Sequence, residues 1–291
     1  MLEMIVQERI ETLEKEVEKQ IKLRAEERNG RTKLQMELRN LRISQAEESG
    51  YHFKPIGHVR TTFPGRAGTP RQPGLVTSSK ALLSVWCADA LKGLSLYSHC
   101  YLVFVFHANT DMGSAKVGGT IKPLVKPPRL AGESTGVFSC RTPHRPNPIG
   151  LSLCKIERVE GKNLHLSGVD LVDGTPILDI KPYLPYSDKP GEDAAVRYPD
   201  WLDSDYNNIH SVALDESLVP ETWPKSSLLC NRTEICQFII QVLSFDVRSL
   251  IQKERHMSEY SVLLDVFKVY FTIEGSSVTV HRIECTNVAN E

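Results

Sequence analysis

The sequence predicts a mainly β protein in which a β-barrel with helical decoration follows an N-terminal helical arm and precedes a small α+β unit. Between residues 51 and 186, short apolar runs alternate with polar residues and are separated by turn residues, which is typical of a small barrel. Residues 1–50 are instead rich in Glu, Lys and Arg, with apolar residues at helical spacing. After residue 230, one helical pattern precedes two strand patterns.

The arm, residues 1–50, has coiled-coil-like features. Its apolar residues recur at intervals of three and four: Ile10, Leu13 and Val17, and later Leu34, Leu38 and Leu41. Asn29 and Gly30 interrupt the pattern, which favours two short helices over one. We expect an arm that binds a protein partner or a second copy, and the alternative is a solvated helical extension.

The expected barrel domain spans residues 51–189. Its predicted strands include His58–Thr62, Tyr101–Phe106, Leu151–Val159, Asn163–Ser167 and Ile177–Lys181. Gly161 and Lys162 predict a hairpin turn between two of these strands. The spacing of apolar residues in Leu82–Leu96 predicts an amphipathic helix.

The remaining chain divides into two parts. Residues 190–230 are polar and interrupted by prolines, which predicts a linker packed along the barrel. Residues 231–291 predict the small α+β unit, with a helix over 234–250 and strands over 262–273 and 278–283.

Composition narrows the class of protein. The chain has 291 residues, 41% of them hydrophobic, which supports a sizeable core. No apolar run is long enough to span a bilayer, and the first residues lack a signal-peptide core. The seven cysteines form no Cys-x-x-Cys pair, so we expect reduced thiols and no metal site. These features predict a cytoplasmic or nuclear protein that is not secreted.

The net charge of −1 hides an uneven distribution of charge. Residues 51–150 hold twelve Lys or Arg against three acids, whereas residues 151–205 hold six against eleven. A basic region can bind phosphate groups. The alternative is a solvated face without a ligand.

Two proline-rich segments have the composition of a ligand-binding site on a rigid backbone. Residues 141–150 read RTPHRPNPIG, and residues 167–185 read SGVDLVDGTPILDIKPYLP. Prolines make such a backbone stiff and extended, which reduces the entropy that Arg145 and Asn147 lose on gripping a ligand. The alternative for either segment alone is a rigid surface loop.

No familiar catalytic motif is present. The sequence lacks a Gly-x-Ser-x-Gly elbow, a Walker loop, a His-Glu-x-x-His motif and the Gly-rich turn of Rossmann-type methyltransferases. The residues alone therefore indicate no methyl donor.

Six collinear motifs carry a family resemblance: KPIGHVR at 54–60, PRQPGLV at 70–76, FVFH at 104–107, KPPRL at 126–130, and the two segments above. In this order they resemble the TsaA-like family, most closely its tRNA methyltransferase O branch. The resemblance runs from about Phe53 to Tyr186 and weakens toward the C-terminus.

The resemblance implies a β-barrel methyltransferase that uses S-adenosyl-L-methionine. It implies N6 of N6-threonylcarbamoyladenosine at position 37, in the anticodon loop of tRNA, as the methyl acceptor, and a homodimer with the cofactor site near its two-fold interface. It places cofactor contacts at Pro70, Arg71, Gln72, Phe106, His107, Arg141, Leu151, Asp173, Gly174, Thr175 and Pro176. An Arg can bind the cofactor carboxylate with two parallel hydrogen bonds.

The remaining candidates concern proton transfer and RNA. Asp173 and Asp179 are the nearest carboxylates that could take the proton from the acceptor nitrogen, whereas Asp170 is expected to form a turn. Lys126, Arg145 and Arg248 are the candidates for tRNA contact. The family commonly has Asp-Pro-Arg-Pro where this chain has Asp-Val-Arg-Ser at 246–249, so the loop lacks both rigid prolines.

Two other functions fit the same residues. One is a catalytically silent barrel that binds RNA or protein, for which no binding of S-adenosylmethionine is expected. The other is a methyltransferase for a small metabolite, which the basic region disfavours.

Overall fold

The structure is a computed structural model that describes residues 2–108, 123–127, 130, 132–191, 194–202, 211–245 and 258–286. The chain divides into two compact units, residues 1–53 and 54–291. None of the described helices is both long and apolar enough to cross a membrane.

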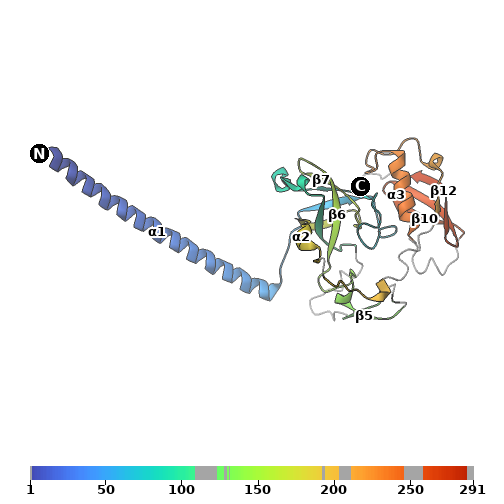
Figure 1. Cartoon of the computed structure of the whole chain (residues 1–291), viewed down its shortest axis with the longest axis horizontal. Helices are drawn as coiled ribbons and strands as arrows, with labels where there is room; N and C mark the ends of the chain where they lie inside the picture. The colour runs from blue at the N-terminus through green and yellow to red at the C-terminus, as the bar shows by residue number, and fades with distance from the viewer. Residues whose placement is uncertain are drawn as a thin grey trace. The chain divides into compact units, whose positions relative to one another are not determined.

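The first unit is built on one helix, α1 (Leu2–Ser49), drawn in blue in Figure 1. The expectation of two helices broken at Asn29 and Gly30 is wrong, because the helix runs through both. A single glycine costs a helix only about 1 kcal/mol, and the surrounding Glu, Arg and Lys residues are good helix formers. Gly50, with φ +82°, follows the last turn, and a left-handed glycine is a common helix stop.

The second unit contains a closed six-stranded barrel with the strand order β1-β2-β7-β6-β3-β8 (Figure 1). The strands are β1 (Gly57–Thr61), β2 (Lys80–Ser84), β3 (His99–Val105), β6 (Ile149–Glu160), β7 (Asn163–Ser167) and β8 (Thr175–Pro182). All neighbouring strands are antiparallel. The predicted hairpin at Gly161 is confirmed, since β6 and β7 pair across it. The predicted fold class, a mainly β-barrel protein, is also confirmed.

Side chains at every second position of the strands point inward and fill the barrel. In β6 every second residue from Gly150 to Ile156 is buried, and in β3 the same holds from Cys100 to Phe104. Gly150 lies directly opposite Phe104, and a Cβ at this position would lie 2.2 Å from the phenyl ring. The barrel therefore requires glycine at the start of β6.

The helix predicted over Leu82–Leu96 is wrong. Its first residues form β2, and two short 3-10 turns follow, η1 (Ala88–Leu91) and η2 (Leu94–Leu96). Pairing of β2 with both β1 and β7 overrides a local helical spacing of apolar residues.

A four-stranded sheet with the order β10-β11-β12-β9 forms the C-terminal part, beside the helix α3 (Arg232–Ser244) (Figure 1). The strands are β9 (Ser211–Ala213), β10 (Tyr260–Leu264), β11 (Phe267–Glu274) and β12 (Ser277–Cys285). The strand predicted over 262–273 is in fact a hairpin that turns at Asp265, whose φ is +52°. The segment 190–230, expected as a linker, supplies β9, which pairs in parallel with β12.

The helix α3 and strand β10 support the long connection between β1 and β2. Phe63 in this connection packs on Phe238 of α3, with ring centroids 5.5 Å apart. The Gln241 side chain accepts hydrogen bonds from the backbone N–H and hydroxyl of Ser78. A Cβ at Gly68 would lie 2.9 Å from side chains of β10, so the connection is held closely against the C-terminal sheet.

The other short elements decorate the barrel and its connections. They are β4 (Leu124–Val125), β5 (Thr135–Gly136), η5 (Val137–Ser139), α2 (Pro185–Asp188), η6 (Asp200–Leu202) and η7 (Glu216–Leu218).

Candidate functional site

Three connections that carry the sequence motifs meet at one rim of the barrel. They join β1 to β2, β3 to β6, and β7 to β8. Because neighbouring strands are antiparallel, the ends of β1, β3 and β7 lie beside the beginnings of β2, β6 and β8. The segments 70–76, 141–148 and 170–174 therefore belong to the same rim, although about a hundred residues separate the first from the last.

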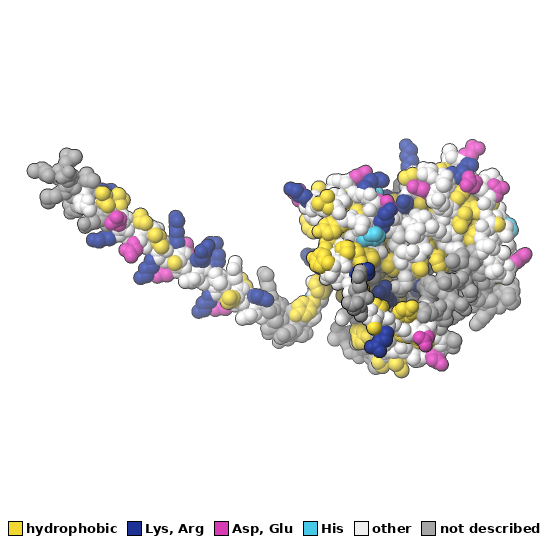
Figure 2. Space-filling model, viewed as in Figure 1, with side chains coloured by type: hydrophobic (Ala, Val, Ile, Leu, Met, Phe, Trp, Pro, Cys, Tyr) yellow, Lys and Arg dark blue, Asp and Glu magenta, His cyan; other side chains and the backbone are white. Residues whose placement is uncertain are grey.

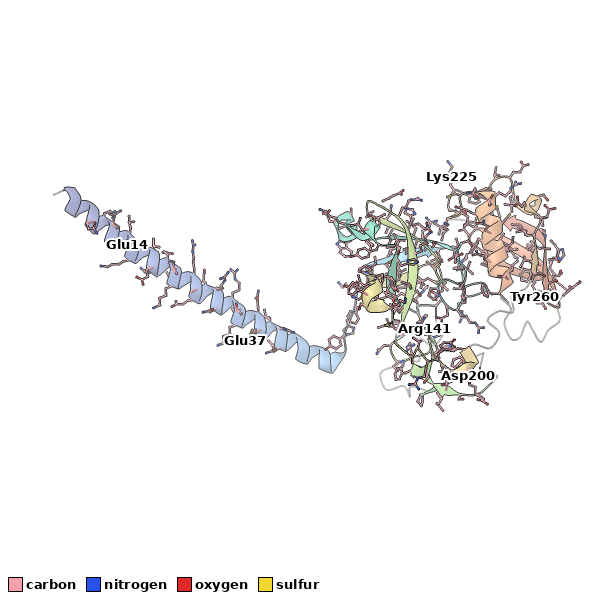
Figure 3. The ribbon with its side chains drawn as sticks, in the orientation of Figure 1. Glu14, Glu37, Arg141, Asp200, Lys225 and Tyr260 are labelled. Atoms are coloured by element: carbon pink, nitrogen blue, oxygen red, sulfur yellow. The ribbon has the colours of Figure 1, made fainter. Side chains whose placement is uncertain are left out.

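Arg141 joins the first two of these connections. Its Nη1 donates a hydrogen bond of 2.8 Å to Oε1 of Gln72, so two residues predicted to bind the cofactor are in direct contact. The guanidinium remains exposed and is labelled in Figure 3. Its positive charge also lowers the pKa of Asp170 on the third connection, which places all three connections within one electrostatic environment.

Asp170 is the most perturbed carboxylate of this rim. Burial raises its pKa to about 6, although a hydrogen bond from Ser152 and the charge of Arg141 oppose the increase. The Ser152 hydroxyl donates to Oδ1 of Asp170 over 2.5 Å. A carboxyl group with such a pKa changes its charge near neutral pH, which is a common property of functional sites.

Backbone contacts fix the connection that carries Gln72. The N–H of Gly74 donates to the carbonyl of Gly168 over 3.0 Å. Both glycines have positive φ, +77° and +68°, a conformation that other residues rarely adopt. Space around the Cα of Gly74 is open on its Cβ side, so a ligand could approach the backbone closely there.

The turn at 173–176 is tied to β1. The Asp173 Oδ1 accepts a 2.8 Å hydrogen bond from the backbone N–H of Thr61, and the N–H of Gly174 donates to the carbonyl of Val59. Thr175 is buried, whereas Asp173 and Gly174 are exposed. The Asp173 carboxylate therefore holds the turn in place and still faces solvent.

His107 and Phe106 lie just beyond β3, as the sequence predicts. The N–H of Phe106 donates to the carbonyl of Pro148, which attaches the proline-rich segment to the end of this strand. Burial lowers the pKa of His107, the nearby His58 lowers it further, and Asp173 opposes the change. His107 therefore shares its surroundings with the turn at 173–176.

Arg145 stabilises the proline-rich segment from within. Its Nη1 donates to the carbonyls of Cys140 and Thr142, at 3.4 and 3.5 Å. The guanidinium also lies over the Phe138 ring, 5.9 Å from its centroid. Arg145, which is predicted to contact a ligand or tRNA, therefore also adds to the stiffness expected from the prolines.

Two predicted site residues lie on the outer wall of the barrel. Leu151 is 55% exposed and alternates with the inward residues of β6. Asp179 of β8 forms an exposed ion pair with Lys181, with 2.9 Å between Oδ2 and Nζ. Both residues are opposite Val103 of β3 in the strand register, so they share one outer surface that is separate from the Arg141 cluster.

The other predicted residues lie nearby or are not described. Pro70 and Arg71 precede Gln72 on the same connection, and Arg71 is exposed. Lys126 is exposed directly after β4. Arg248 and the altered segment 246–249 lie outside the described residues.

Sequence reasoning missed the role of Asp170 and Ser152. Asp170 was assigned to a turn, yet it is largely buried against Ser152. One signal was available: Ser152 is a hydroxyl residue at an inward position of an otherwise non-polar alternation in β6. Buried polar groups need partners, and the partner here comes from a connection that is remote in sequence.

Comparison with known proteins agrees with this architecture. Residues 58–189 match the tRNA-methyltransferase O N-terminal domain. The tRNA (adenine(37)-N6)-methyltransferase of Escherichia coli (strain K12) is 34% identical over 247 residues, which cover 81% of this chain and 99% of the relative. The mouse enzyme of the same name is 48% identical over 143 residues, or 47% of this chain and 32% of the relative.

A solved structure extends the likeness to three dimensions. The crystal structure of TrmO from Pseudomonas aeruginosa superposes with a TM-score of 0.57 at 27% identity, covering 80% of this chain and 98% of that chain. The match to the mouse, rat and human relatives spans only about a third of their length. Since the E. coli relative is covered almost completely, the chain belongs to the tRNA-methyltransferase O family.

Proposed function

We propose that the protein is an S-adenosylmethionine-dependent methyltransferase that modifies N6 of N6-threonylcarbamoyladenosine at position 37 of tRNA. The observation that carries the proposal is the cluster of Gln72, Arg141 and Asp170, in which three connections meet at one rim. Relatives that are 48% and 34% identical over their matched residues are named tRNA (adenine(37)-N6)-methyltransferases, and another is named a putative S-adenosylmethionine-dependent methyltransferase.

The side chains of the cluster fit the groups of this cofactor. The exposed guanidinium of Arg141 suits a carboxylate, which it can bind with two parallel hydrogen bonds. The carboxylate of Asp170 beside it suits an ammonium group. Open space on the Cβ side of Gly74 and Gly174 lets backbone groups approach a ribose or an adenine edge. When bound, the cofactor supplies a methyl group on a positively charged sulfur.

The chain's own residues would orient the acceptor and receive its proton. Of the two carboxylates expected for this role, Asp173 fits better, because it is exposed at the rim beside His107. Asp179 is held on the outer wall by its ion pair with Lys181. We therefore propose that the Asp173 carboxylate takes the proton from the acceptor nitrogen. Its Oδ1 is held in place by the hydrogen bond that it accepts from the backbone N–H of Thr61.

We propose that tRNA reaches this rim along its basic residues. Lys126 is exposed beside the β4–β5 hairpin, where its charge can bind a phosphate. Arg145 contributes mainly by holding the proline-rich segment, and Arg248 keeps its proposed role in RNA contact. An anticodon loop suits such a site because its bases are unstacked and accessible.

We also propose that the barrel acts as a homodimer. Its outer wall carries an apolar stripe of Val103, Val105, Ile149 and Leu151, in adjacent register on β3 and β6. Ile149 and Leu151 are 40% and 55% exposed. Because Leu151 lies on this stripe, apart from the Arg141 cluster of its own barrel, we propose that its predicted cofactor contact is made with the site of the second barrel.

Calorimetry with S-adenosylmethionine tests the proposed activity. The wild-type chain should bind saturably, and Arg141→Ala should weaken binding about ten- to a hundredfold, since a charge-assisted contact contributes roughly 1.5–3 kcal/mol. Arg158→Ala, which removes an exposed guanidinium from the later part of β6 rather than from the connection before it, is the matched control. A catalytically silent barrel would show no binding in any variant.

Product analysis tests the acceptor. Mass spectrometry of position 37 nucleosides, in tRNA from cells that lack the protein, should show the threonylcarbamoyl nucleoside without its methyl group. Restoring the wild-type gene should restore the methyl group, whereas Asp173→Asn should not. Full methylation in the deleted cells would exclude this acceptor.

A further inference from the structure

Every described side chain of α1 is exposed, although the helix carries an apolar surface. Ile10, Leu13, Val17 and Ile21 line a shallow groove together with Glu14 and Glu18. Figure 2 shows hydrophobic side chains between charged ones along this helix. Because a helix gains most of its stability from packing of such a surface, we expect a partner to cover this surface of α1.

We propose that the partner is α1 of a second copy, in an antiparallel coiled coil with the two chains in one defined register. The proposal rests on one heptad phase that is kept from Ile10 to Leu41. Counting from Ile10 as position a, the a positions are Ile10, Val17, Arg24, Arg31 and Leu38, and the d positions are Leu13, Gln20, Glu27, Leu34 and Leu41.

The polar residues of this pattern lie in its middle. The a and d positions together form the seam of the coil. Both ends of this seam are apolar, and they are separated by Gln20, Arg24, Glu27 and Arg31. Both apolar ends occupy a and d positions of the same heptad count, so they lie on the same side of the helix although polar residues separate them. A helix with this seam can pair along its full length only if the central charges find suitable partners.

An antiparallel pairing supplies those partners. When residue numbers that face each other sum to 51, every a position meets a d position of the other helix. Ile10 then faces Leu41, Leu13 faces Leu38, and Val17 faces Leu34, at both ends of the coil. In the centre, Gln20 faces Arg31 and Arg24 faces Glu27, so each charged layer contains opposite charges or a charge and an amide.

The parallel alternative buries the same apolar residues, in different layers, and fails in the centre. There each residue faces its own copy, so Arg24 faces Arg24, Glu27 faces Glu27 and Arg31 faces Arg31. Like charges at close range in the seam are repulsive. Since the apolar contribution is equal in both arrangements, the central charges decide between them and favour the antiparallel one.

Other antiparallel registers are worse. A shift by one heptad in either direction places Leu13 against Arg31 or Leu34 against Arg24, which buries charges against apolar side chains. Between residues 10 and 41 the proposed register has one unfavourable contact, between Glu16 and Glu37, which flank the a and d layers at g positions whose numbers sum to 53. Both glutamates are exposed, where repulsion is weaker than in the central layers.

Charge reversal in the full-length protein tests the register. In the antiparallel coil, Arg24→Glu creates two Glu–Glu layers and should weaken association of the arms about tenfold or more. Adding Glu27→Arg to the same chain recreates opposite charges and should restore association. In a parallel coil the single change has little effect, because like charges already face each other there. Sedimentation equilibrium of the three proteins measures the difference.

Two controls keep the result specific. Lys22→Glu makes the same change of charge in the same part of the helix but on its outer surface, and it should leave the assembly unchanged. Circular dichroism should show a loss of helix in Arg24→Glu and its recovery in the double variant. An Arg24→Glu protein that keeps both the sedimentation and the helix content of wild type, or a double variant that fails to recover helix content, would overturn the antiparallel register. These outcomes are independent of methyl transfer.

Discussion

The barrel and the helix α1 use the same kinds of apolar residue with opposite results. In the barrel, residues distant in sequence pair across six strands, and side chains such as Leu102, Leu164 and Ile177 are completely buried. In α1, the equally apolar Leu13 and Leu38 are more than half exposed. The barrel completes its core within one chain, whereas α1 carries only one of the two helices of the proposed coiled-coil core. The structure of the barrel therefore depends on packing within the chain, and we expect the structure of α1 to depend on protein concentration.

The tryptophans make this difference measurable. All three, Trp86, Trp201 and Trp223, lie in the second unit, so their fluorescence reports on that unit alone. The signal of α1 appears instead in far-ultraviolet circular dichroism. The two regions can thus be followed separately in one sample.

The largest effect is expected from Gly150→Ala. A Cβ at this position would lie within 2.7 Å of three carbons of the Phe104 ring, and neither strand of the closed barrel can move away freely. We expect a loss of about 3 kcal/mol in the free energy of unfolding, measured by urea titration with tryptophan fluorescence. Gly136→Ala, where the nearest atom to a Cβ is 3.5 Å away, should change it little. Equal stabilities would show that the barrel is looser than its packing indicates.

A pH-dependent effect is expected from Asp170→Asn. Since burial raises the folded pKa of Asp170 from 3.8 to about 6, the folded state binds more protons than the unfolded state between these values. Wild-type stability should therefore fall as pH rises from about 4 to 6 through this group. The variant lacks this decline, so its stability relative to wild type should be higher at pH 8 than at pH 4, by up to about 3 kcal/mol. A constant difference across this range would mean that Asp170 titrates normally.

A smaller effect is expected from Lys126→Glu. If this exposed residue contacts a tRNA phosphate, its reversal should weaken tRNA binding about tenfold and reduce the salt slope by roughly 0.7. Binding of S-adenosylmethionine should not change. Lys225→Glu, an equal charge reversal on the C-terminal part of the chain (Figure 3), provides the control. If both variants bind tRNA equally, the basic face is only solvated.

The smallest effect separates the two regions directly. Leu38→Glu places a charge in the apolar seam of α1 and should lower helix content at micromolar concentration. The free energy of unfolding followed by tryptophan fluorescence should stay within about 0.5 kcal/mol of wild type, as is usual for exposed positions. A coupled loss of both signals would show that the second unit depends on the arm.

Removal of the arm extends this test to assembly. A chain that begins at Tyr51 should still sediment as a dimer through the apolar stripe of β3 and β6. A monomer that retains methyl transfer would show that the barrel does not require its partner.

Local patterns predicted those elements that local contacts determine. The β6–β7 hairpin was accessible because Gly161 marks a turn between two alternating strands. Leu82–Leu96 was misassigned because its helical spacing is real, and only pairing with β1 and β7 makes Leu82 part of a strand. Likewise, the three residues of β9 show no strand pattern, and their pairing with β12 is remote in sequence.

The site was predicted in the same uneven way. Motifs indicated Gln72 and Arg141, and the structure brings them into contact. Asp170 could not be recognised, because its burial depends on Ser152 from another strand. The Asp179 carboxylate could in principle accept a proton, but inward and outward side chains alternate along β8, and this places Asp179 on the outer wall of the barrel.

The short connection between α1 and the barrel limits how far the barrel can lie from the end of the helix. Four residues, 50–53, span at most about 14 Å. In the antiparallel coil the two Ser49 residues lie about 70 Å apart, from a rise of about 1.5 Å per residue. In this arrangement the folded units of the two chains start from opposite ends of the coil, each within about 14 Å of its own helix end. The proposed coil would thus hold two copies of the proposed site in one assembly, so that a tRNA molecule released from one copy would meet the other at a raised local concentration.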